Sequence, residues 1–455
     1  MLGLDASLNW ALYVILVLFA CFMDTPTKTD DTYVVVGAGV FGTSVAFHLI
    51  QTYPSADVVL IDRGPFPHEA GASWDWNKAV RADYTNPLYM ELALEAMELW
   101  RSDPLYKTYY HQSGLVWLDN KGLPQTIIDN YNKLNASENY RMSNPEEVRK
   151  LWDGVHENAD YTNVTDIFIN ESSGWVEATK ALTRVIEAAL AAGVRYIAAD
   201  IKEVIFDDHG AAKGVQTSSG DALLAKHVIL ATGAYTPKLL MDSAPERKEI
   251  HAGHRIVAAG ICETLVNLND EEAKYFRQGP VFVHEVGETL GSWNATGGVI
   301  PTNPENQIKF YRDVSFTNTI LHEAAGQNIS VPPNRADYDQ WNLSPGMKTE
   351  VGLTVKGIYG DKSADWKFTD YRICWDAITP SQDHVICEHP HSKNLYIVTG
   401  GSFHSWKFLP ILGKYAIQMI TGNLDAKLVK TWAWDREDNG GAHEGLIPHR
   451  EMRDI

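Results

Sequence analysis

The spacing of apolar and polar residues near the start of the chain predicts a strand, a helix and a second strand. Tyr33–Val36 is a short β-branched run bounded by glycine, as in a buried strand. Residues 41–53 repeat apolar side chains at helical spacing, and residues 56–62 form another buried run. A strand, a helix and a strand within about thirty residues have the size of a βαβ unit.

Farther along, residues 174–197 predict a helix followed by a strand. Alternating positions from residue 201 predict a β-meander that closes on a buried strand at Val228–Ala231. The small turn that follows, Ala231 to Gly233, either lies against a dinucleotide or is an ordinary strand end. The remaining stretches, about 112–173 and 242–371, are irregular and rich in aromatic residues, and we interpret them as a second domain inserted into the first.

The segment "VVVGAGVFG" joins the first strand to the first helix with the glycine spacing G-x-G-x-x-G. In a dinucleotide site, Gly37 permits the tight turn and Gly39 lets the backbone approach a pyrophosphate. Gly42 lets the helix pack on the strand. The helix N-terminus, at Val40 and Phe41, offers free N–H groups and positive potential to the phosphates.

The second strand ends at Asp62, which lies at the spacing expected for an acid that accepts from a ribose hydroxyl. We expect Asp62 and the adjacent Arg63 to contact the cofactor. Only one such glycine motif is present, near the N-terminus, and most of the chain follows it. This favours one tightly held dinucleotide and therefore FAD, although some flavoproteins bind NADPH without this motif.

The net charge of −19 and the pI near 5.2 argue against nucleic-acid binding, which needs basic patches. They do not exclude an anionic substrate, because a site is a local arrangement of charge. No Cys-x-x-Cys pair is present, and no metal site is predicted. The cysteines are Cys21, Cys262, Cys374 and Cys387.

Residues 11–23 form a continuous apolar run that is short for a membrane span and fits the core of a signal peptide better. No Lys or Arg precedes it, so the run is either a secretory leader, cleaved or anchored, or a leader of no structural consequence. Any membrane contact is expected through this run alone. The chain lacks the peroxisomal S-K-L ending. Sequons that would suit a secretory route, but that also arise by chance, lie at Asn135, Asn163, Asn170, Asn294, Asn328 and Asn342.

Two C-terminal segments, "YRICWDAITPSQDHVICEHP" and "NLYIVTGGSFHSWKFLPILGKYAIQMI", resemble the sarcosine-oxidase-like family of flavin amine oxidases. The similarity covers about residues 33–435 and is greatest to the fungal branch of fructosyl amino acid oxidases (amadoriases) and L-pipecolate or L-saccharopine oxidases. The fold class expected is α/β (an α+β two-domain flavoprotein), a Rossmann-type FAD-binding domain with an inserted mixed-sheet substrate domain. The expected segments are 31–111, 174–241 and 372–435 for FAD, 112–173 and 242–371 for substrate, 1–30 as leader and 436–455 as polar tail.

The resemblance implies that Cys374, in "CWDAITPSQ", bonds covalently through its sulfur to the flavin 8α-methyl group; a buried structural cysteine is the alternative. In the loop "GSFHSWKF", Lys407 matches a lysine that holds the substrate carboxylate beside the flavin. Phe403, expected at the cofactor, and Ser405 replace family glycines, and Trp406 replaces a phenylalanine. These larger residues are expected to reshape the pocket.

The segment that begins at Ser73, "SWDWNKAVRADYTNPLY", resembles the one that crosses the isoalloxazine. Arg81 matches an arginine that pairs with the substrate carboxylate, a role suited to its planar fork. Lys78 matches a second basic residue near the flavin. Lys309, in "NQIKFYRD", matches the oxygen-activating lysine, which would stabilise negative charge developing on oxygen. Without the resemblance, each would be interpreted as a surface charge.

Together these residues predict an FAD-dependent oxidase of a secondary-amine amino acid, with C–N oxidation to an imine and reduction of O2 to hydrogen peroxide. The partners expected are a small amino-acid-like substrate and O2, and the protein is expected to be a monomer. Two alternatives stay open. One is a tailoring oxidase whose imine is trapped by cyclisation, and the other is a flavin-binding protein without catalysis.

Overall fold

The computed structural model describes residues 31–286, 296–334, 339–436, 441 and 443–455. The apolar run 11–23 and the sequon at Asn294 lie outside these ranges. Among the helices in them, none has the length and apolar character needed to cross a membrane. Asn170, one of the predicted sequons, is buried and donates to Asp83 Oδ1 at 2.7 Å, so it is closed to glycosylation in this fold.

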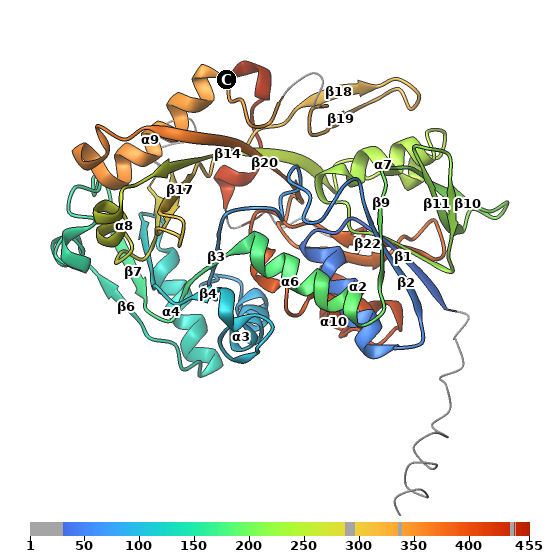
Figure 1. Cartoon of the computed structure of the whole chain (residues 1–455), viewed down its shortest axis with the longest axis horizontal. Helices are drawn as coiled ribbons and strands as arrows, with labels where there is room; N and C mark the ends of the chain where they lie inside the picture. The colour runs from blue at the N-terminus through green and yellow to red at the C-terminus, as the bar shows by residue number, and fades with distance from the viewer. Residues whose placement is uncertain (1–30, 287–295, 335–338, 437–440, 442) are drawn as a thin grey trace, which may run out of the picture.

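The predicted βαβ unit forms the centre of the first of two large sheets (Figure 1). All neighbouring strands pair in parallel except β21 and β22. The predictions of the first two strands and of the strand at 228–231 are confirmed. In spatial order the strands are β21 (Val385–Glu388), β22 (Leu395–Thr399), β13 (His227–Leu230), β1 (Thr32–Val36), β2 (Asp57–Asp62) and β9 (Arg195–Ala198).

Helices cover one face of this sheet and the predicted β-meander covers the other. The alternation within β1 explains this arrangement, since Val35 packs with the helices while Val34 and Val36 pack with the meander. The helices are α2 (Val40–Thr52), α6 (Ala178–Ala191) and α10 (Leu412–Ile420). The meander consists of β10 (Ile201–Phe206), β11 (Ala212–Thr217) and β12 (Ala222–Leu224), beside α7 (Thr236–Ser243).

The stretches that look irregular in sequence form a second, mixed sheet of eight strands. Only β15 and β5 pair in parallel. The prediction of a mixed-sheet domain is confirmed, whereas the irregular character expected of these stretches is wrong. The strands are β20 (Phe368–Ile378), β14 (Val257–Asn267), β17 (Gln307–Tyr311), β16 (Gly297–Ile300), β15 (Val281–Glu285), β5 (Leu115–Asp119), β7 (Asp166–Asn170) and β6 (Tyr140–Ser143).

One face of the second sheet packs on helices, and the other is turned toward the first sheet. Helix α9 (Pro345–Tyr359) and α8 (Asp270–Phe276) cover the outer face, where Phe282, Ile308 and Phe310 are buried. Alternate residues of the same strands point to the opposite face and line a cavity. The other helices are α3 (Pro87–Ser102), α4 (Leu123–Leu134), α5 (Pro145–Val148) and α11 (Ala426–Thr431).

Smaller sheets join the two parts. Strand β3 (Lys78–Val80) pairs with β8 (Gly174–Val176), which also pairs with β4 (Tyr110–His111). The hairpin β18 (Thr319–His322) and β19 (Gln327–Ser330) stands at the edge of the molecule (Figure 1).

Strand β20 contains residue 372, where the sequence predicts a domain boundary. This strand pairs with β14 from Phe368 to Ile378, so the boundary falls inside a strand of the second sheet. The C-terminal segment also packs on this part of the molecule: Met452 N donates to Thr317 O at 2.7 Å, and Ser344 Oγ donates to Ile455 O at 2.8 Å.

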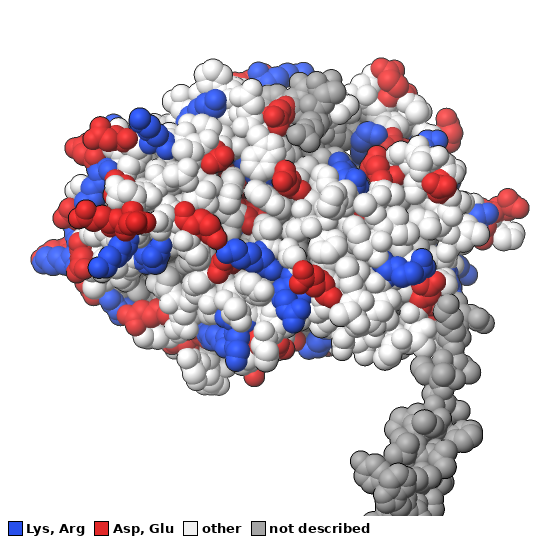
Figure 2. Space-filling view, viewed as in Figure 1, with Lys and Arg blue, Asp and Glu red and all other residues white. Residues whose placement is uncertain are grey.

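Charged side chains on the face shown in Figure 2 are interspersed, with acidic and basic residues side by side and uncharged areas between them. Ion pairs at the protein surface include Arg195 with Asp57 and Lys414 with Glu95. On this face the negative net charge is therefore spread out.

Candidate active site

The glycine turn after β1 has no room for side chains. Gly37 has φ +99°, and a Cβ there would lie 2.4 Å from the Ala231 carbonyl oxygen. A Cβ on Gly42 would lie 1.8 Å from the Gly37 carbonyl oxygen, and one on Gly39 would lie 2.7 Å from Ser73 Oγ. Side chains at these positions would collide with backbone or with Ser73, so the turn is closed to residues other than glycine.

The residues around this turn are held by hydrogen bonds. Asp62 Oδ2 accepts from Ala38 N at 2.8 Å, and Asp62 Oδ1 accepts from Arg63 N at 2.8 Å. Val40 N, in the first turn of α2, donates to Ser73 Oγ at 2.8 Å. The Arg63 guanidinium lies over the Tyr235 ring, 3.8 Å from its centroid. Because Ser73 accepts from the N–H of Val40, the expectation that this N–H is free is wrong.

A cavity of about 1600 Å³ extends from this turn to the inner face of the second sheet. Its size exceeds that of an ordinary small-ligand pocket, about 300–1,000 Å³, and suits a dinucleotide together with a substrate. Of the predicted site residues, Gly42 alone is not at its wall and lies beneath Gly37. The wall contains Gly37, Gly39, Val40, Phe41, Asp62, Arg63, Ser73, Lys78, Arg81, Lys309, Cys374, Phe403 and Lys407.

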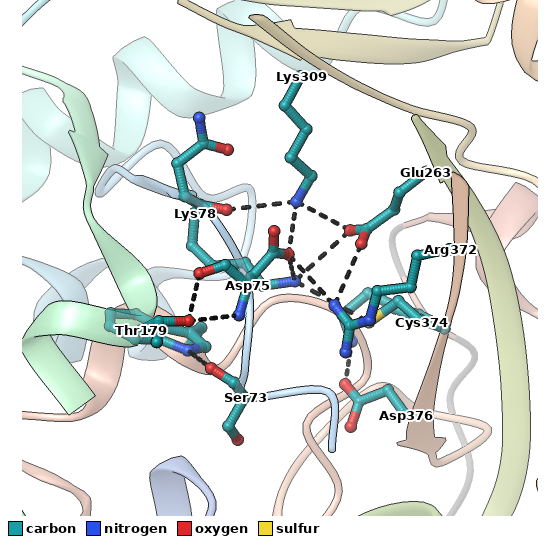
Figure 3. Close-up of polar contacts among 12 residues, drawn as sticks. Ser73, Asp75, Lys78, Thr179, Glu263, Lys309, Arg372, Cys374 and Asp376 are labelled. Atoms are coloured by element: carbon teal, nitrogen blue, oxygen red, sulfur yellow. Dashed lines mark hydrogen bonds and ion pairs between the residues drawn. The ribbon is translucent and has the colours of Figure 1, made fainter. Parts of the chain in front are cut away.

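Lys309 lies at the centre of a buried ionic cluster (Figure 3). Its Nζ is 2.5 Å from Asp75 Oδ2 and 2.9 Å from Glu263 Oε1. Lys78 Nζ lies 2.7 Å from the same Asp75 oxygen, and Arg372 Nη1 lies 3.3 Å from Glu263 Oε2. Because Lys309 is 1% exposed, the alternative of an exposed strand lysine is wrong.

Three cations and two carboxylates leave the cluster with one excess positive charge. Burial opposes ionisation of Asp75, but Lys309, Lys78 and Arg372 outweigh it and hold the pKa of its carboxyl below the usual range. Burial likewise opposes the charge of Lys78, but Asp75 leads the groups that raise its pKa above the usual value. The cluster is therefore a fixed positive charge in a region shielded from water.

Cys374 lies beside this cluster, on β20, with its sulfur 3.9 Å from Lys78 Nζ. Burial raises the pKa of Cys374 to about 11, while Lys78 and Arg372 act in the opposite direction. A thiolate is needed for bond formation by sulfur, so these two cations would assist it. By contrast, Cys262 is buried in an apolar cluster of the second sheet.

Arg81 and Lys407 are placed together at another part of the wall. The Arg81 guanidinium donates to the Asp83 carbonyl and lies 4.6 Å from the Trp117 ring centroid. Lys407 Nζ donates to Tyr84 Oη at 2.8 Å and to the His404 carbonyl at 2.6 Å. Within the described ranges neither cation forms an ion pair.

Hydrogen bonds hold the loop 401–408, which departs from the family pattern, in place. Phe403 adopts φ +60°, a conformation that favours glycine, and its N–H donates to Asp376 Oδ2 at 2.8 Å. Ser405 Oγ lies 2.7 Å from His384 Nε2. Trp406 Nε1 donates to the Ser73 carbonyl at 2.9 Å, which joins this loop to the segment that begins at Ser73.

Several charged residues of the site were missed at the level of sequence. Two of them, Glu263 and Arg372, stand among apolar residues of a strand, in "GICETLV" and "YRICW", and buried charges normally have partners. That isolation signals burial but does not identify the partner. The missed residues are Asp75, Glu263, Glu285, Asp313 and Arg372.

Comparison with known proteins agrees with this architecture. A family model described as FAD dependent oxidoreductase (DAO) matches residues 32–419. L-saccharopine oxidase of Schizosaccharomyces pombe is 26% identical, over 90% of this chain and 94% of its own length. Human peroxisomal sarcosine oxidase is 22% identical, over 85% of this chain and 91% of its own.

Solved structures share the fold. A modified fructosyl peptide oxidase from Aspergillus nidulans superposes with a TM-score of 0.80 at 22% identity, over 94% of this chain and 99% of that chain. The fructosamine oxidase Amadoriase II of Aspergillus fumigatus gives 0.74 at 24% identity, over 94% and 93%. The family match and these relatives show that the chain belongs to the FAD-dependent oxidoreductases, in the sarcosine-oxidase-like group of amine oxidases.

Proposed function

We propose that this protein oxidises the C–N bond of a secondary-amine amino acid or a related metabolite to an imine, with O2 as the electron acceptor. The observation that carries the proposal is the pair Arg81 and Lys407. Among the described residues neither side chain forms an ion pair with a carboxylate, and both lie in the wall of a cavity beside the glycine turn. A bound anion would therefore stabilise the charge of Arg81 and favour the charged form of Lys407.

FAD fits the residues present. The turn at Gly37 and Gly39 would receive the pyrophosphate, Asp62 the ribose, and Cys374 the flavin ring, to which its sulfur would be bonded. When bound, FAD accepts a hydride from the carbon next to the amine and passes two electrons to O2, which gives hydrogen peroxide.

Arg81 and Lys407 would hold the substrate carboxylate. Burial, followed by the charge of Arg81, lowers the pKa of Lys407 well below its usual value. A bound carboxylate would favour the charged form of Lys407 and offset part of the free-energy cost of its burial. Fixing the carboxylate also fixes the carbon that carries the amine, so the reacting atoms meet in one orientation.

The ionic cluster around Lys309 would serve the oxygen step. Negative charge develops on a small, poorly solvated molecule there, and a fixed cation stabilises it without reorganisation. Asp75 and Glu263 hold Lys309 in place on both sides. No general base is required if the amine binds in its neutral form. Water would then hydrolyse the imine, or an internal nucleophile would trap it.

A peroxide-release screen tests the proposal. The purified flavin-loaded protein would be offered N-methyl amino acids, pipecolate, saccharopine and glycated amino acids, with Lys407→Met as the matched control. We expect peroxide from at least one secondary amine and a carbonyl or cyclised product in equal amount. Flavin that is not bleached by any of these amines without oxygen would favour a non-catalytic flavin-binding protein.

A further inference from the structure

Lys407 Nζ is the donor in two hydrogen bonds that form whether the lysine is charged or neutral. One acceptor is the His404 carbonyl oxygen, which lies 2.6 Å from Lys407 Nζ. The other is Tyr84 Oη, at 2.8 Å. A neutral amine carries two N–H groups and an ammonium group carries three, so both forms satisfy these two acceptors.

The direction of the bond to Tyr84 follows from the contacts of His404. His404 Nε2 lies 2.8 Å from the Gln382 carbonyl oxygen, which can only accept, so this nitrogen carries the ring proton. Burial, followed by the charge of Lys407, lowers the pKa of His404 well below its usual value, so Nδ1 has no proton. The Tyr84 hydroxyl directs its only proton to His404, where Nδ1 lies at 3.0 Å and the carbonyl oxygen at 3.3 Å. Tyr84 Oη therefore accepts from Lys407.

The third position on Lys407 Nζ has no partner among the described residues, and the side chain lines the cavity. In a charged lysine this position is a third N–H group. In a neutral lysine it is a lone pair. The two forms of Lys407 thus differ in what they offer to a ligand: the first donates a proton and the second accepts one.

Lys407 is placed where a positive charge is disfavoured before a ligand binds. Its side chain is 5% exposed, and burial, followed by the charge of Arg81, lowers its pKa well below the usual value. Arg81 Cζ and Lys407 Nζ each lie 5.0 Å from the centroid of the Tyr84 ring, so two cations would flank one side chain. Lys78, on the neighbouring strand β3, is by contrast paired with Asp75.

The carboxylates nearest to Lys407 have other partners. Asp83 favours the charged form of Lys407, but its oxygens are already occupied. They accept hydrogen bonds from Tyr131, Asn170 and Ser173. Glu285 and Asp313 interact with Arg81 and are not among the groups that shift the pKa of Lys407.

The other titratable side chains packed around Lys407 are uncharged. His384 is stacked with His404 at a centroid distance of 5.7 Å, and burial lowers its pKa to about 3. Burial raises the pKa values of Tyr84 and Tyr89, so their hydroxyls keep their protons. Lys407 is therefore the group in this part of the wall whose charge can change when a ligand binds.

We propose that Lys407 is a neutral amine in the free protein and accepts the proton of the substrate ammonium group as the substrate binds. This rests on the proposed function for the identity of the reacting amine. An amine as basic as a lysine side chain arrives protonated at neutral pH and cannot lose a hydride until that proton is removed. In an amino acid the amine and the carboxylate are attached to the same carbon, so a group that contacts one can reach the other.

The step conserves protons and charge. One N–H bond of the substrate ammonium breaks, and its electron pair stays on the substrate nitrogen. The lone pair of Lys407 Nζ forms a new N–H bond with the same proton. The substrate amine is then neutral and ready for oxidation, and the new lysine ammonium pairs with the substrate carboxylate. No proton is exchanged with the solvent.

Two ligands of the same shape measure this transfer without turnover. Pivalate has a methyl group where α-aminoisobutyrate has an ammonium group, and neither has a hydrogen on the carbon next to the carboxylate, so the flavin stays oxidised. Each would be titrated calorimetrically into the holoprotein at neutral pH, in two buffers of different ionisation enthalpy. We expect pivalate to take up about one proton from the buffer and α-aminoisobutyrate almost none, because it brings its own.

An isotopic nitrogen label on α-aminoisobutyrate shows where the proton lies. Its NMR chemical shift in the complex should be that of a neutral amine in the wild type and that of an ammonium ion in Lys407→Arg. Arginine supplies a charge for the carboxylate but does not take up a proton, so this variant should bind pivalate without uptake. Lys407→Met should also lose the uptake. Lys414→Met, which removes an exposed lysine paired with Glu95, is the matched control and should behave as wild type.

Flavin content and melting temperature establish that each variant is folded. Equal uptake for the two ligands, no uptake with pivalate, or uptake retained in the Lys407 variants would overturn the assignment. An ammonium shift in the wild-type complex, or no measurable binding of either ligand, would overturn it as well.

The peroxide screen separates this result from the proposed function. If a secondary amine is oxidised while bound α-aminoisobutyrate stays an ammonium ion, the proposed function stands and Lys407 is not the proton acceptor. If no amine is oxidised and the proton counts are as expected, Lys407 accepts the proton in a site that does not carry out this oxidation.

Discussion

Two groups of basic residues line the same cavity. One group is paired with buried carboxylates, and the other contacts neutral groups. Lys78, Lys309 and Arg372 share Asp75 and Glu263, so each cation has a carboxylate partner and the group keeps one excess positive charge. Arg81 and Lys407 contact carbonyls, a hydroxyl and aromatic rings, and neither forms an ion pair with a carboxylate in the part of the chain that the structure describes. The first group is built to keep its positions, and the second is built to receive an anion.

This difference teaches that cation identity alone does not reveal a role. A paired buried cation acts as a fixed field, since moving it would expose the carboxylates that hold it. A buried cation without a paired anion is unstable by itself and gains most when a ligand supplies the charge.

Replacing Cys374 with alanine should release the flavin completely from the denatured protein. The sulfur lies in the cavity wall next to Lys78, where a covalent bond to the ring is expected. Acid precipitation of wild type should give a yellow pellet and that of Cys374→Ala a colourless one. Cys387→Ala is the control and should stay yellow; a colourless wild-type pellet from flavin-loaded protein would show that the bond does not exist.

Replacing Asp75 with asparagine should strongly destabilise the paired group. The change leaves three buried cations with one carboxylate, and breaking a buried ion pair typically costs about 3–5 kcal/mol. Urea denaturation would measure the shift in midpoint. Asp57→Asn, which breaks an exposed pair with Arg195, should cost no more than about 1 kcal/mol. Similar losses of stability for the two variants would show that the buried cluster contributes no more than an exposed ion pair.

Removing Arg81 should weaken substrate binding with little effect on stability. Charged hydrogen bonds contribute about 1.5–3 kcal/mol, so KM for the best substrate should rise tenfold or more in Arg81→Ala. Lys407→Met should behave similarly. An Arg81→Ala enzyme with unchanged KM would show that the carboxylate is held elsewhere.

A smaller expected effect is a change in the protonation of Lys407 when a carboxylate binds. The pKa of Lys407 is lowered well below its usual value by burial and by Arg81, and a bound carboxylate should raise it again. A group whose pKa rises on binding takes up protons, so affinity should fall as pH increases through that range. Calorimetry with butyrate in two buffers of different ionisation enthalpy should detect the uptake, and Lys407→Met should lose it.

The part of the site that sequence predicted well is local. The turn at Gly37 and Gly39 and the acid at Asp62 lie within one βαβ unit, so their spacing nearly determines their geometry. Resemblance to a family supplied Lys309, Arg81 and Lys407, and the structure brings them to one cavity.

The ionic cluster could not be predicted in this way. Asp75, Glu263 and Arg372 come from a loop and from strands β14 and β20, and they meet only because these strands pair in one register. A single charge in an apolar strand indicates burial, but its partner depends on contacts between distant segments. The same holds for Glu285, at the end of β15, and Asp313, just after β17, which line one cavity although they are far apart in the sequence.

Stopped-flow measurement of the two half-reactions tests the central contrast most directly, with Lys309→Met and Arg81→Ala compared side by side. We predict that Lys309→Met keeps anaerobic flavin reduction within roughly tenfold of wild type and slows reoxidation by oxygen about 10²-fold or more. Arg81→Ala should do the opposite: it should weaken the substrate dependence of reduction and leave reoxidation near wild type. If Lys309→Met slows reduction and spares reoxidation, the division of roles between the paired and unpaired cations is wrong.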